Sequence, residues 1–252
     1  MKQALFFLLL CSICISCKKQ KDEPKPDPGA QLNYTNTYNI NGHTIKNSYS
    51  YNSLGMLYEE FIKDETTGEE LYQTYRHKDN VLYLSDIAND RRKVSKIKYT
   101  FLHQKLSSME YFEYDQYENT TFLFKRNFEY ANEQLKISTT GADGTPGEYQ
   151  IFTFSGGNVI EVSTYSASSA PVNTIAYEYD GKTNPYQGKY DQLHSPEGYS
   201  KSNITKSTLT DHQKGDQVSV TVYAYEYTSA GYPTKLYSTG ANRKLLKTYH
   251  YQ

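Results

Sequence analysis

Apolar and polar residues alternate along much of the chain with the period of a β-strand. The stretch from Val218 to Tyr227 shows this alternation most clearly. Successive side chains of a strand point to opposite faces, so the stretch separates into two sets: Val218, Val220, Val222 and Ala224 on one face, and Ser219, Thr221, Tyr223, Tyr225 and Tyr227 on the other. We expect the valine face to be core. The tyrosine face is amphipathic, with rings that cover apolar surface and hydroxyls that meet water.

A short aromatic phrase recurs along the chain and predicts a repeated hairpin. Aligned on its second aromatic residue, the phrase falls at Tyr51, Tyr75, Phe101, Tyr130, Phe154, Tyr179 and Tyr227. The intervals are 24 to 29 residues long except for the last, which is 48 and which we interpret as two units, one without aromatics near Asn203. A repeat of about 25 residues is too short for a propeller blade, but it accommodates two strands and two short connections.

The fold class that this pattern predicts is all-β. No window of about 12 residues keeps apolar residues at the helical spacing without an intervening Gly, Pro or β-branched run. Polar and charged residues occur on both faces of most predicted strands, whereas a transmembrane barrel needs an uninterrupted apolar band towards the lipid. We therefore expect an antiparallel meander of repeated hairpins that forms a water-soluble barrel or half-barrel.

Segments rich in turn-forming residues mark the connections between strands. Residues 140–147 and 155–158 contain Asp-Gly or Gly-Gly pairs. They predict tight turns, because they lack the ligand residues of a calcium or phosphate loop. The segment from Asp180 to about Thr208 is rich in Gly, Pro, Asn and Ser and interrupts the hairpin rhythm. We expect a long connection over one end of the barrel, which either contacts a ligand or simply caps the core.

The first 31 residues differ in character from the rest of the chain. Residues 1–16 combine Lys2 with an apolar run from Ala4 to Ile15, which is typical of a cleaved signal peptide and too short for a stable membrane span. A retained membrane anchor is the alternative. Residues 17–31 are polar and contain three prolines, so they predict an extended tether. Residues 32–252 then form a single all-β domain.

All three cysteines, Cys11, Cys14 and Cys17, lie in or beside the leader, so the rest of the chain has no disulfide and no thiolate metal site. The sequence Ile15-Ser16-Cys17 resembles the lipobox of bacterial lipoproteins, with Cys14 where that family usually has Leu. The resemblance implies that Cys17 is the lipid attachment site and the first residue of the mature chain, with Cys14 or Cys11 as the fallback. Residues 20–23, Gln-Lys-Asp-Glu, resemble the acidic signal that directs lipoproteins to the outer face of the outer membrane. An ordinary charged linker is the other interpretation, and the cell surface is favoured over the periplasmic face.

Motifs in the second half of the chain resemble a family of uncharacterised lipoproteins from Gram-negative anaerobes. The resemblance is most specific from Tyr177 to Leu236, and it is carried by residues 177–180 (Tyr-Glu-Tyr-Asp), 184–186 (Asn-Pro-Tyr), 202–206 (Ser-Asn-Ile-Thr-Lys), 225–227 (Tyr-Glu-Tyr) and 231–235 (Gly-Tyr-Pro-Thr-Lys). The family's fold is porin-like, a β-barrel or half-barrel in a lipid-tethered protein. It has no assigned activity, so the resemblance implies fold and location and no catalytic residue.

Charge and motif content argue against several classes of function. Removing Lys2 with the leader takes the 27 basic residues to 26, against 28 acidic residues, and leaves a net charge of −2. This balance provides no basic stripe for nucleic acid. The 6 histidines stand singly, without the spacing of a zinc site, and no Gly-x-Ser-x-Gly elbow marks a nucleophile. A Ser-His-Asp set assembled from distant residues stays open, since triads are defined by geometry. We expect no enzyme, no metal and no cofactor.

Two non-catalytic functions remain, with a hydrolase as a less favoured alternative. The tyrosine face and the long connection favour a ligand-binding module for a glycan or peptide, because a tyrosine ring offers a flat apolar face and a polar edge. The same rings could instead fill the barrel interior. The alternative function is that of a structural or assembly partner of an outer-membrane complex, with an exposed aromatic patch as the docking surface.

Overall fold

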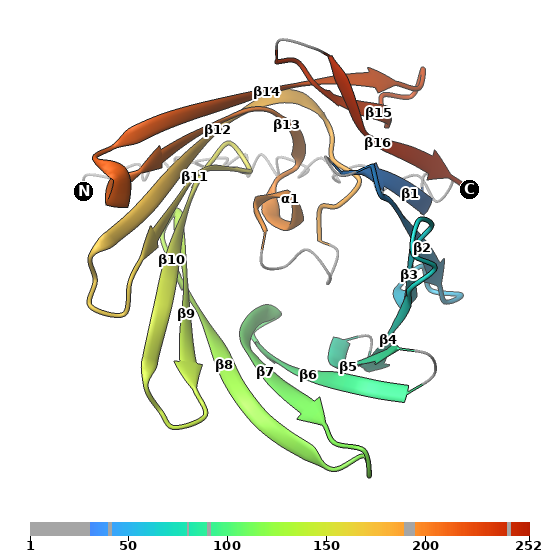
Figure 1. The fold of residues 1–252 in the computed structure, drawn as a ribbon, viewed down its shortest axis with the longest axis vertical. Helices are drawn as coiled ribbons and strands as arrows, with labels where there is room; N and C mark the ends of the chain where they lie inside the picture. The colour runs from blue at the N-terminus through green and yellow to red at the C-terminus, as the bar shows by residue number, and fades with distance from the viewer. Residues whose placement is uncertain (1–30, 40–41, 80, 90–91, 189–194, 241–242) are drawn as a thin grey trace, which may run out of the picture.

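The computed structural model describes residues 31–39, 42–79, 81–89, 92–188, 195–240 and 243–252. These residues form one antiparallel barrel (Figure 1). Its strands are β1 (Leu32–Tyr38), β2 (Thr44–Tyr51), β3 (Leu57–Asp64), β4 (Glu70–Lys78), β5 (Val81–Asn89), β6 (Arg92–Leu102), β7 (Lys105–Tyr114), β8 (Thr120–Ala131), β9 (Gln134–Gly141), β10 (Pro146–Ser155), β11 (Asn158–Tyr165), β12 (Pro171–Thr183), β13 (Ser202–Asp211), β14 (Gln217–Tyr227), β15 (Pro233–Ser238) and β16 (Lys244–Tyr251). Two short helices accompany them, α1 (Pro196–Tyr199) and the 3₁₀-helix η3 (His212–Lys214).

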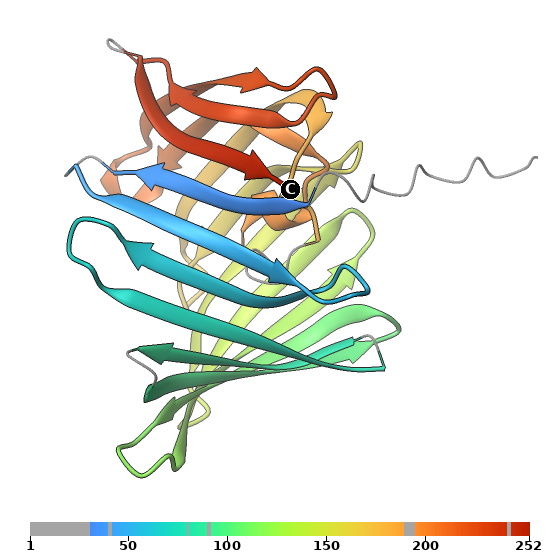
Figure 2. The same cartoon turned by 90° about the vertical axis from the view of Figure 1, so that its right-hand side faces the viewer.

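The barrel is a closed meander. Each strand pairs with its neighbours in sequence, and the first strand pairs with the last, with Thr35 opposite Tyr249. Figure 2 shows β1, in blue, beside β16, in red. Closure satisfies the backbone hydrogen bonds of every strand and leaves no edge open to aggregation. The predicted all-β meander of hairpins is confirmed, and of the two predicted forms the closed barrel is the observed one. In the described part of the chain, no helix has the length and apolar character to cross a membrane.

The aromatic phrase marks one hairpin per repeat. Its members lie on the even-numbered strands from β2 to β14, close to the end of the barrel at which β1 begins. We call this end the tether end, and the opposite end the far end. The last interval of the repeat joins consecutive even strands, β12 and β14. The prediction of a lost unit near Asn203 is therefore wrong, because Asn203 lies on β13 and residues 184–201 are an insertion between β12 and β13.

The faces of β14 are the reverse of the predicted ones. Val218, Val220 and Val222 point outwards and are 58%, 55% and 42% exposed. Tyr223 and Tyr225 point inwards, where both line a cavity. A wide barrel needs large side chains to fill its interior, and tyrosine supplies that volume while its hydroxyl finds polar partners inside. The prediction that the valine face is core is thus wrong for this strand.

The interior is built from rings and aliphatic side chains of many strands. Its most buried members, all less than a tenth exposed, include Tyr49, Tyr75, Leu82, Tyr99, Met109, Phe128, Leu135, Phe152, Val159, Val162 and Tyr249. Several tyrosine hydroxyls inside the barrel make hydrogen bonds, among them those of Tyr75, Tyr99 and Tyr179. The hydroxyl of Tyr99, for example, lies 3.1 Å from the hydroxyl of Ser85. Such pairing is required, because a buried hydroxyl without a partner costs about 1–3 kcal/mol.

Candidate functional site

The connection between β12 and β13 turns into the barrel. Figure 1 shows α1 inside the ring of strands. We call the described part of this connection, residues 184–188 and 195–201, the inner segment. The connection was expected to lie over one end of the barrel and to last until about Thr208. Both expectations are wrong, because the inner segment lies within the barrel and β13 already begins at Ser202.

Polar side chains hold the inner segment in place. The Asn184 side-chain amide donates hydrogen bonds to the carbonyl oxygens of Glu197 (2.6 Å) and Ser200 (2.7 Å), and its Oδ1 accepts one from the N–H of Tyr186 (2.9 Å). The Ser200 hydroxyl, which is fully buried, accepts a hydrogen bond from the N–H of Val159 on β11 (3.0 Å). The segment is therefore bonded both to itself and to the barrel wall.

The ring of Tyr199 adds an apolar anchor. It packs edge-on against Phe152 and Phe154 of β10, with ring centroids 5.8 Å and 6.0 Å apart. Burial raises the pKa of Tyr199 far above its usual value of 10.0, so the phenol is neutral under all physiological conditions. Edge-to-face aromatic pairs of this kind contribute about 0.5–1.5 kcal/mol each beyond their area burial.

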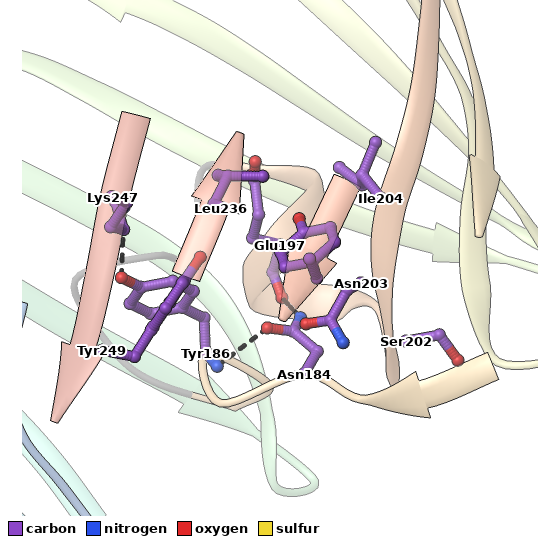
Figure 3. Close-up of a pocket in the computed structure, with 10 residues that line it drawn as sticks. Asn184, Tyr186, Glu197, Ser202, Asn203, Ile204, Leu236, Lys247 and Tyr249 are labelled. Atoms are coloured by element: carbon purple, nitrogen blue, oxygen red, sulfur yellow. Dashed lines mark hydrogen bonds between the residues drawn. The ribbon is translucent and has the colours of Figure 1, made fainter. Parts of the chain in front are cut away.

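Two adjoining cavities lie between the inner segment and the inner faces of β12 to β16. The smaller has a volume of about 130 Å³ and is shown in Figure 3. The larger has a volume of about 380 Å³. Four residues line both cavities: Glu197, Ile204, Tyr225 and Leu236. The larger cavity is also lined by Ile175, Tyr177, Pro196, Ser207 and Tyr223. We call the whole of this larger cavity the tyrosine cavity.

Of the described residues that line the tyrosine cavity, Glu197 alone is charged. It is half-buried, and in the described part of the chain no side chain makes a hydrogen bond or ion pair with its carboxylate. The negative charge of Glu197 acts on the neighbouring rings of Tyr177 and Tyr225. Burial in the first place, and the negative charge of Glu197 in addition, raise the pKa values of Tyr177 and Tyr225 well above 10.0. The cavity thus combines neutral aromatic walls with one carboxylate.

The smaller cavity has its own cation. Lys247 of β16 donates a hydrogen bond to the Tyr186 hydroxyl at 3.1 Å, and its Nζ lies 4.9 Å from the centre of the same ring (Figure 3). Tyr249 is buried beside them, with its ring centroid 6.1 Å from that of Tyr186. A cation held over an aromatic ring gains about 0.5–2 kcal/mol. Lys247 is therefore engaged with the inner segment.

The inner face of β14 is exposed to solvent at the far end of the barrel. The inward-facing positions of β14 run from Ser219 and Thr221, which are exposed, to Tyr223 and Tyr225, which are half-buried. β14 begins at the far end, after the turn that contains η3. Water thus reaches the inner face of β14 from that end, whereas the inner segment fills the barrel from the tether end.

The sequence predicted part of this site. The tyrosine face of β14 was expected to be either core or a binding surface, and the structure places the inward tyrosines in two settings. Tyr249 is buried in the core, whereas Tyr177, Tyr223 and Tyr225 line the tyrosine cavity. Sequence reasoning missed Glu197, for which the only signal was its place in the long connection. The predicted lipid attachment site, Cys17, lies outside the described residues.

Comparison with known proteins places the fold beside one porin-like structure. A crystal structure of a porin-like protein from Bacteroides uniformis superposes with a TM-score of 0.59 at 14% sequence identity, covering 90% of this chain and 98% of that one. A protein with unknown function from Bacteroides fragilis is matched with a TM-score of 0.30 at 11% identity, over 52% of this chain and 89% of that one. No protein-family model and no curated protein matches the sequence. The similarity to the porin-like protein, at this identity, concerns the fold alone.

Proposed function

We propose that this protein is a lipid-anchored, extracytoplasmic barrel that binds a glycan or peptide in its interior and has no catalytic activity. The observation that carries the proposal is the tyrosine cavity. Three tyrosines, Tyr177, Tyr223 and Tyr225, surround a half-buried carboxylate, that of Glu197, in a space of about 380 Å³. Small-ligand sites combine apolar or aromatic walls with a few convergent polar groups in this way, at volumes from about 300 Å³ upwards.

The outward face of the barrel supports a position in water, beside the membrane. Ion pairs lie on this face within the strands, for example Lys125 with Glu110 (3.7 Å) and Lys206 with Glu178 (2.7 Å). Charged side chains facing hydrocarbon at mid-membrane cost about 2–4 kcal/mol each. The barrel strands are therefore proposed to stay outside the bilayer.

The N-terminal lipid would provide the attachment to the outer membrane. In this proposal residues 1–16 are cleaved, Cys17 is acylated, and residues 17–31 connect the lipid to β1. β1 begins at the tether end, so the solvent-exposed part of the inner face of β14, at the far end, would lie away from the membrane. The acidic signal at residues 20–23 favours the cell surface over the periplasmic face.

A cysteine replacement tests the anchor. Cys17→Ala should move the protein from the detergent phase to the aqueous phase in a Triton X-114 partition of bacteria that express it. It should also remove the acyl mass from the N-terminal peptide. Cys14→Ala is the matched control and should leave both readouts unchanged. Acylation that persists in Cys17→Ala would contradict the assignment of this residue.

A thermal-shift screen tests ligand binding. The protein is residues 17–252 with Cys17→Ser, which keeps every described strand and removes the acylation site. A ligand at 100 times its Kd stabilises the folded state by about 2.7 kcal/mol, so a true hit raises the Tm by several degrees. The rise should disappear in Tyr225→Leu and persist in Tyr149→Leu, whose ring stacks on Tyr165 on the outer face. A blank across a broad panel of glycans and peptides would contradict the ligand-binding function.

The outward valines favour a second candidate function, a structural partner of an outer-membrane complex. Val218, Val220 and Val222 form an exposed row on one strand. Contiguous exposed apolar surface is typical of protein interaction sites. In cells, site-specific photo-crosslinking from position 220 should then capture one outer-membrane protein, and a crosslinker at outward position 161 on β11 should not. If the crosslinkers at positions 220 and 161 capture the same amount of this outer-membrane protein, or none, the docking function is contradicted.

A further inference from the structure

Glu197 belongs to the lining of the tyrosine cavity, and its part in ligand choice rests on the ligand-binding function proposed above. The side chain belongs to α1, and Asn184 fixes the backbone of this residue by donating to its carbonyl oxygen at 2.6 Å. The carboxylate is thus presented to the cavity by a segment that is bonded to the barrel. A half-buried carboxylate has lost part of its hydration and gains most from a group of opposite charge.

The described residues provide no such group for Glu197. The other residues that line the tyrosine cavity are aromatic, aliphatic or hydroxyl-bearing, and none of them is cationic. Lys247 lines the smaller cavity, is absent from the lining of the larger one, and donates a hydrogen bond to the Tyr186 hydroxyl. Among the described residues, the Glu197 carboxylate is thus left without a counter-charge, and a cationic group of a ligand would supply one.

The aromatic walls of the cavity also favour a positively charged ligand group. The face of a tyrosine ring carries a partial negative charge, so it attracts cations and disfavours anions. Tyr177, Tyr223 and Tyr225 contribute three such rings around one carboxylate. Phosphate and carboxylate ligands would be repelled by Glu197, and none of the described residues of this cavity carries a positive charge to attract them.

We propose that the tyrosine cavity binds the ammonium group of its ligand, with the Glu197 carboxylate as counter-ion and Tyr177, Tyr223 and Tyr225 as the aromatic wall. At about 380 Å³ the cavity admits one small group, such as an amino sugar or the side chain of a lysine residue. Both carry the same ammonium chemistry. Entry is from the far end, past Ser219 and Thr221.

Isothermal titration with two matched probe pairs tests this proposal on residues 17–252 with Cys17→Ser. The first pair is glucosamine and glucose, and the second is Nα-acetyl-lysine amide and Nα-acetyl-norleucine amide. Within each pair only one member carries an ammonium group. We expect the ammonium member of at least one pair to bind about tenfold or more tightly than its neutral partner, as a charge-assisted contact implies. The pair that shows the difference identifies the source of the group.

Charge-neutral replacements give the decisive comparison. Glu197→Gln keeps the shape of the side chain and should abolish the preference for the ammonium member. Glu178→Gln is the control, because Glu178 lies outside the cavity and pairs with Lys206 on the outer face. The Glu178→Gln variant should prefer the ammonium member of each probe pair as strongly as the parent protein does. Circular dichroism melting of both variants verifies that they fold.

The outcomes separate this inference from the ligand-binding function itself. If a glycan or peptide binds in a Tyr225-dependent way but its affinity ignores the ammonium group or survives Glu197→Gln, the ammonium site is overturned and the binding function stands. If neither ammonium probe binds, the ammonium site is overturned as well. If no compound of the wider panel binds either, both proposals fail.

Discussion

The hydroxyl of Tyr75 donates a hydrogen bond to the carboxylate of Glu60 at 3.2 Å, and the two residues are only 4% and 3% exposed. The other oxygen of Glu60 accepts a hydrogen bond from the side-chain amide of Asn47 at 2.8 Å. Three neighbouring strands, β2, β3 and β4, are thus linked through one buried carboxylate on the inner face of the barrel. Charge-assisted hydrogen bonds are stronger than neutral ones, and a buried charge that loses a donor is destabilising.

Tyr75→Phe should therefore lower the stability of the barrel. The substitution removes the hydroxyl and preserves the ring, so its effect reports the hydrogen bond to Glu60. We expect the free energy of unfolding to fall by about 1–3 kcal/mol, measured by urea denaturation. Tyr58→Phe is the control, because Tyr58 is 44% exposed, and its effect should be close to zero. Equal effects of the two substitutions would show that the buried bond adds no stability.

The same substitution at two valines should lower the free energy of unfolding by very different amounts. Val162 points into the barrel and is 4% exposed, whereas Val220 points outwards and is 55% exposed. Valine and threonine have nearly the same shape, so Val→Thr replaces a methyl group with a hydroxyl. Val162→Thr should cost about 1–3 kcal/mol, since the hydroxyl must be buried, and Val220→Thr should change the free energy of unfolding by less than about 0.5 kcal/mol. The reverse order would mean that the faces of β14 are those expected from hydropathy.

The contrast between these valines shows what the sequence can and cannot predict. Alternation along β14 predicts a strand and separates its two faces, but it does not say which face is inside. In a small core the aliphatic face would be buried. In this wide barrel, the interior is filled by larger side chains, among them Tyr49, Tyr99 and Phe152. The recurrence of the aromatic phrase on successive even strands was a signal for their inward position that the valine pattern on a single strand obscured.

The inner segment shows a second limit. Its composition predicts a long connection, and the structure confirms one between β12 and β13. Its path into the barrel depends on contacts with residues far away in sequence, such as the bond from the Val159 N–H to Ser200 and the packing of Tyr199 on Phe152. No local pattern encodes these contacts. The place of Glu197 in the cavity follows from these long-range contacts. The sequence alone therefore could not predict it.

The pH dependence of the barrel should include a contribution from Asp64. The hydrogen bond between the Asp64 carboxylate and the His43 ring, 2.8 Å long, is the largest of several contacts that lower the pKa of Asp64 from 3.8 to about 2. The backbone N–H groups of Thr66 and Thr67 add to this effect, while burial opposes it. Because the pKa in the folded state is the lower one, the carboxylate stabilises the fold above pH 3.8, and this contribution is lost as the pH falls towards about 2.

Carbon-detected NMR titration of the Asp64 side chain measures this pKa directly. In His43→Ala the pKa should move upwards towards 3.8 and stay below it, because the donors at Thr66 and Thr67 remain. His212→Ala provides the control, since His212 pairs with Asp216 at the far end and does not contact Asp64. An Asp64 pKa that is the same with and without His43 would assign the shift to the backbone donors alone.

Asn184→Asp should release the inner segment from the barrel. The carboxylate has the shape of the amide but cannot donate to the carbonyl oxygens of Glu197 and Ser200, which the native side chain bonds at 2.6 Å and 2.7 Å. The loss of donors to buried carbonyls should cost at least about 1–3 kcal/mol and should speed up amide hydrogen exchange at residues 195–201. Asn36→Asp is the matched control, because Asn36 makes only a long contact of 3.4 Å to Thr248 on the outer face. Ligand binding in the tyrosine cavity should weaken in Asn184→Asp alone, since this variant frees the backbone that positions Glu197. Exchange at residues 195–201 that matches the parent protein would mean that the ring of Tyr199 is sufficient to hold the segment.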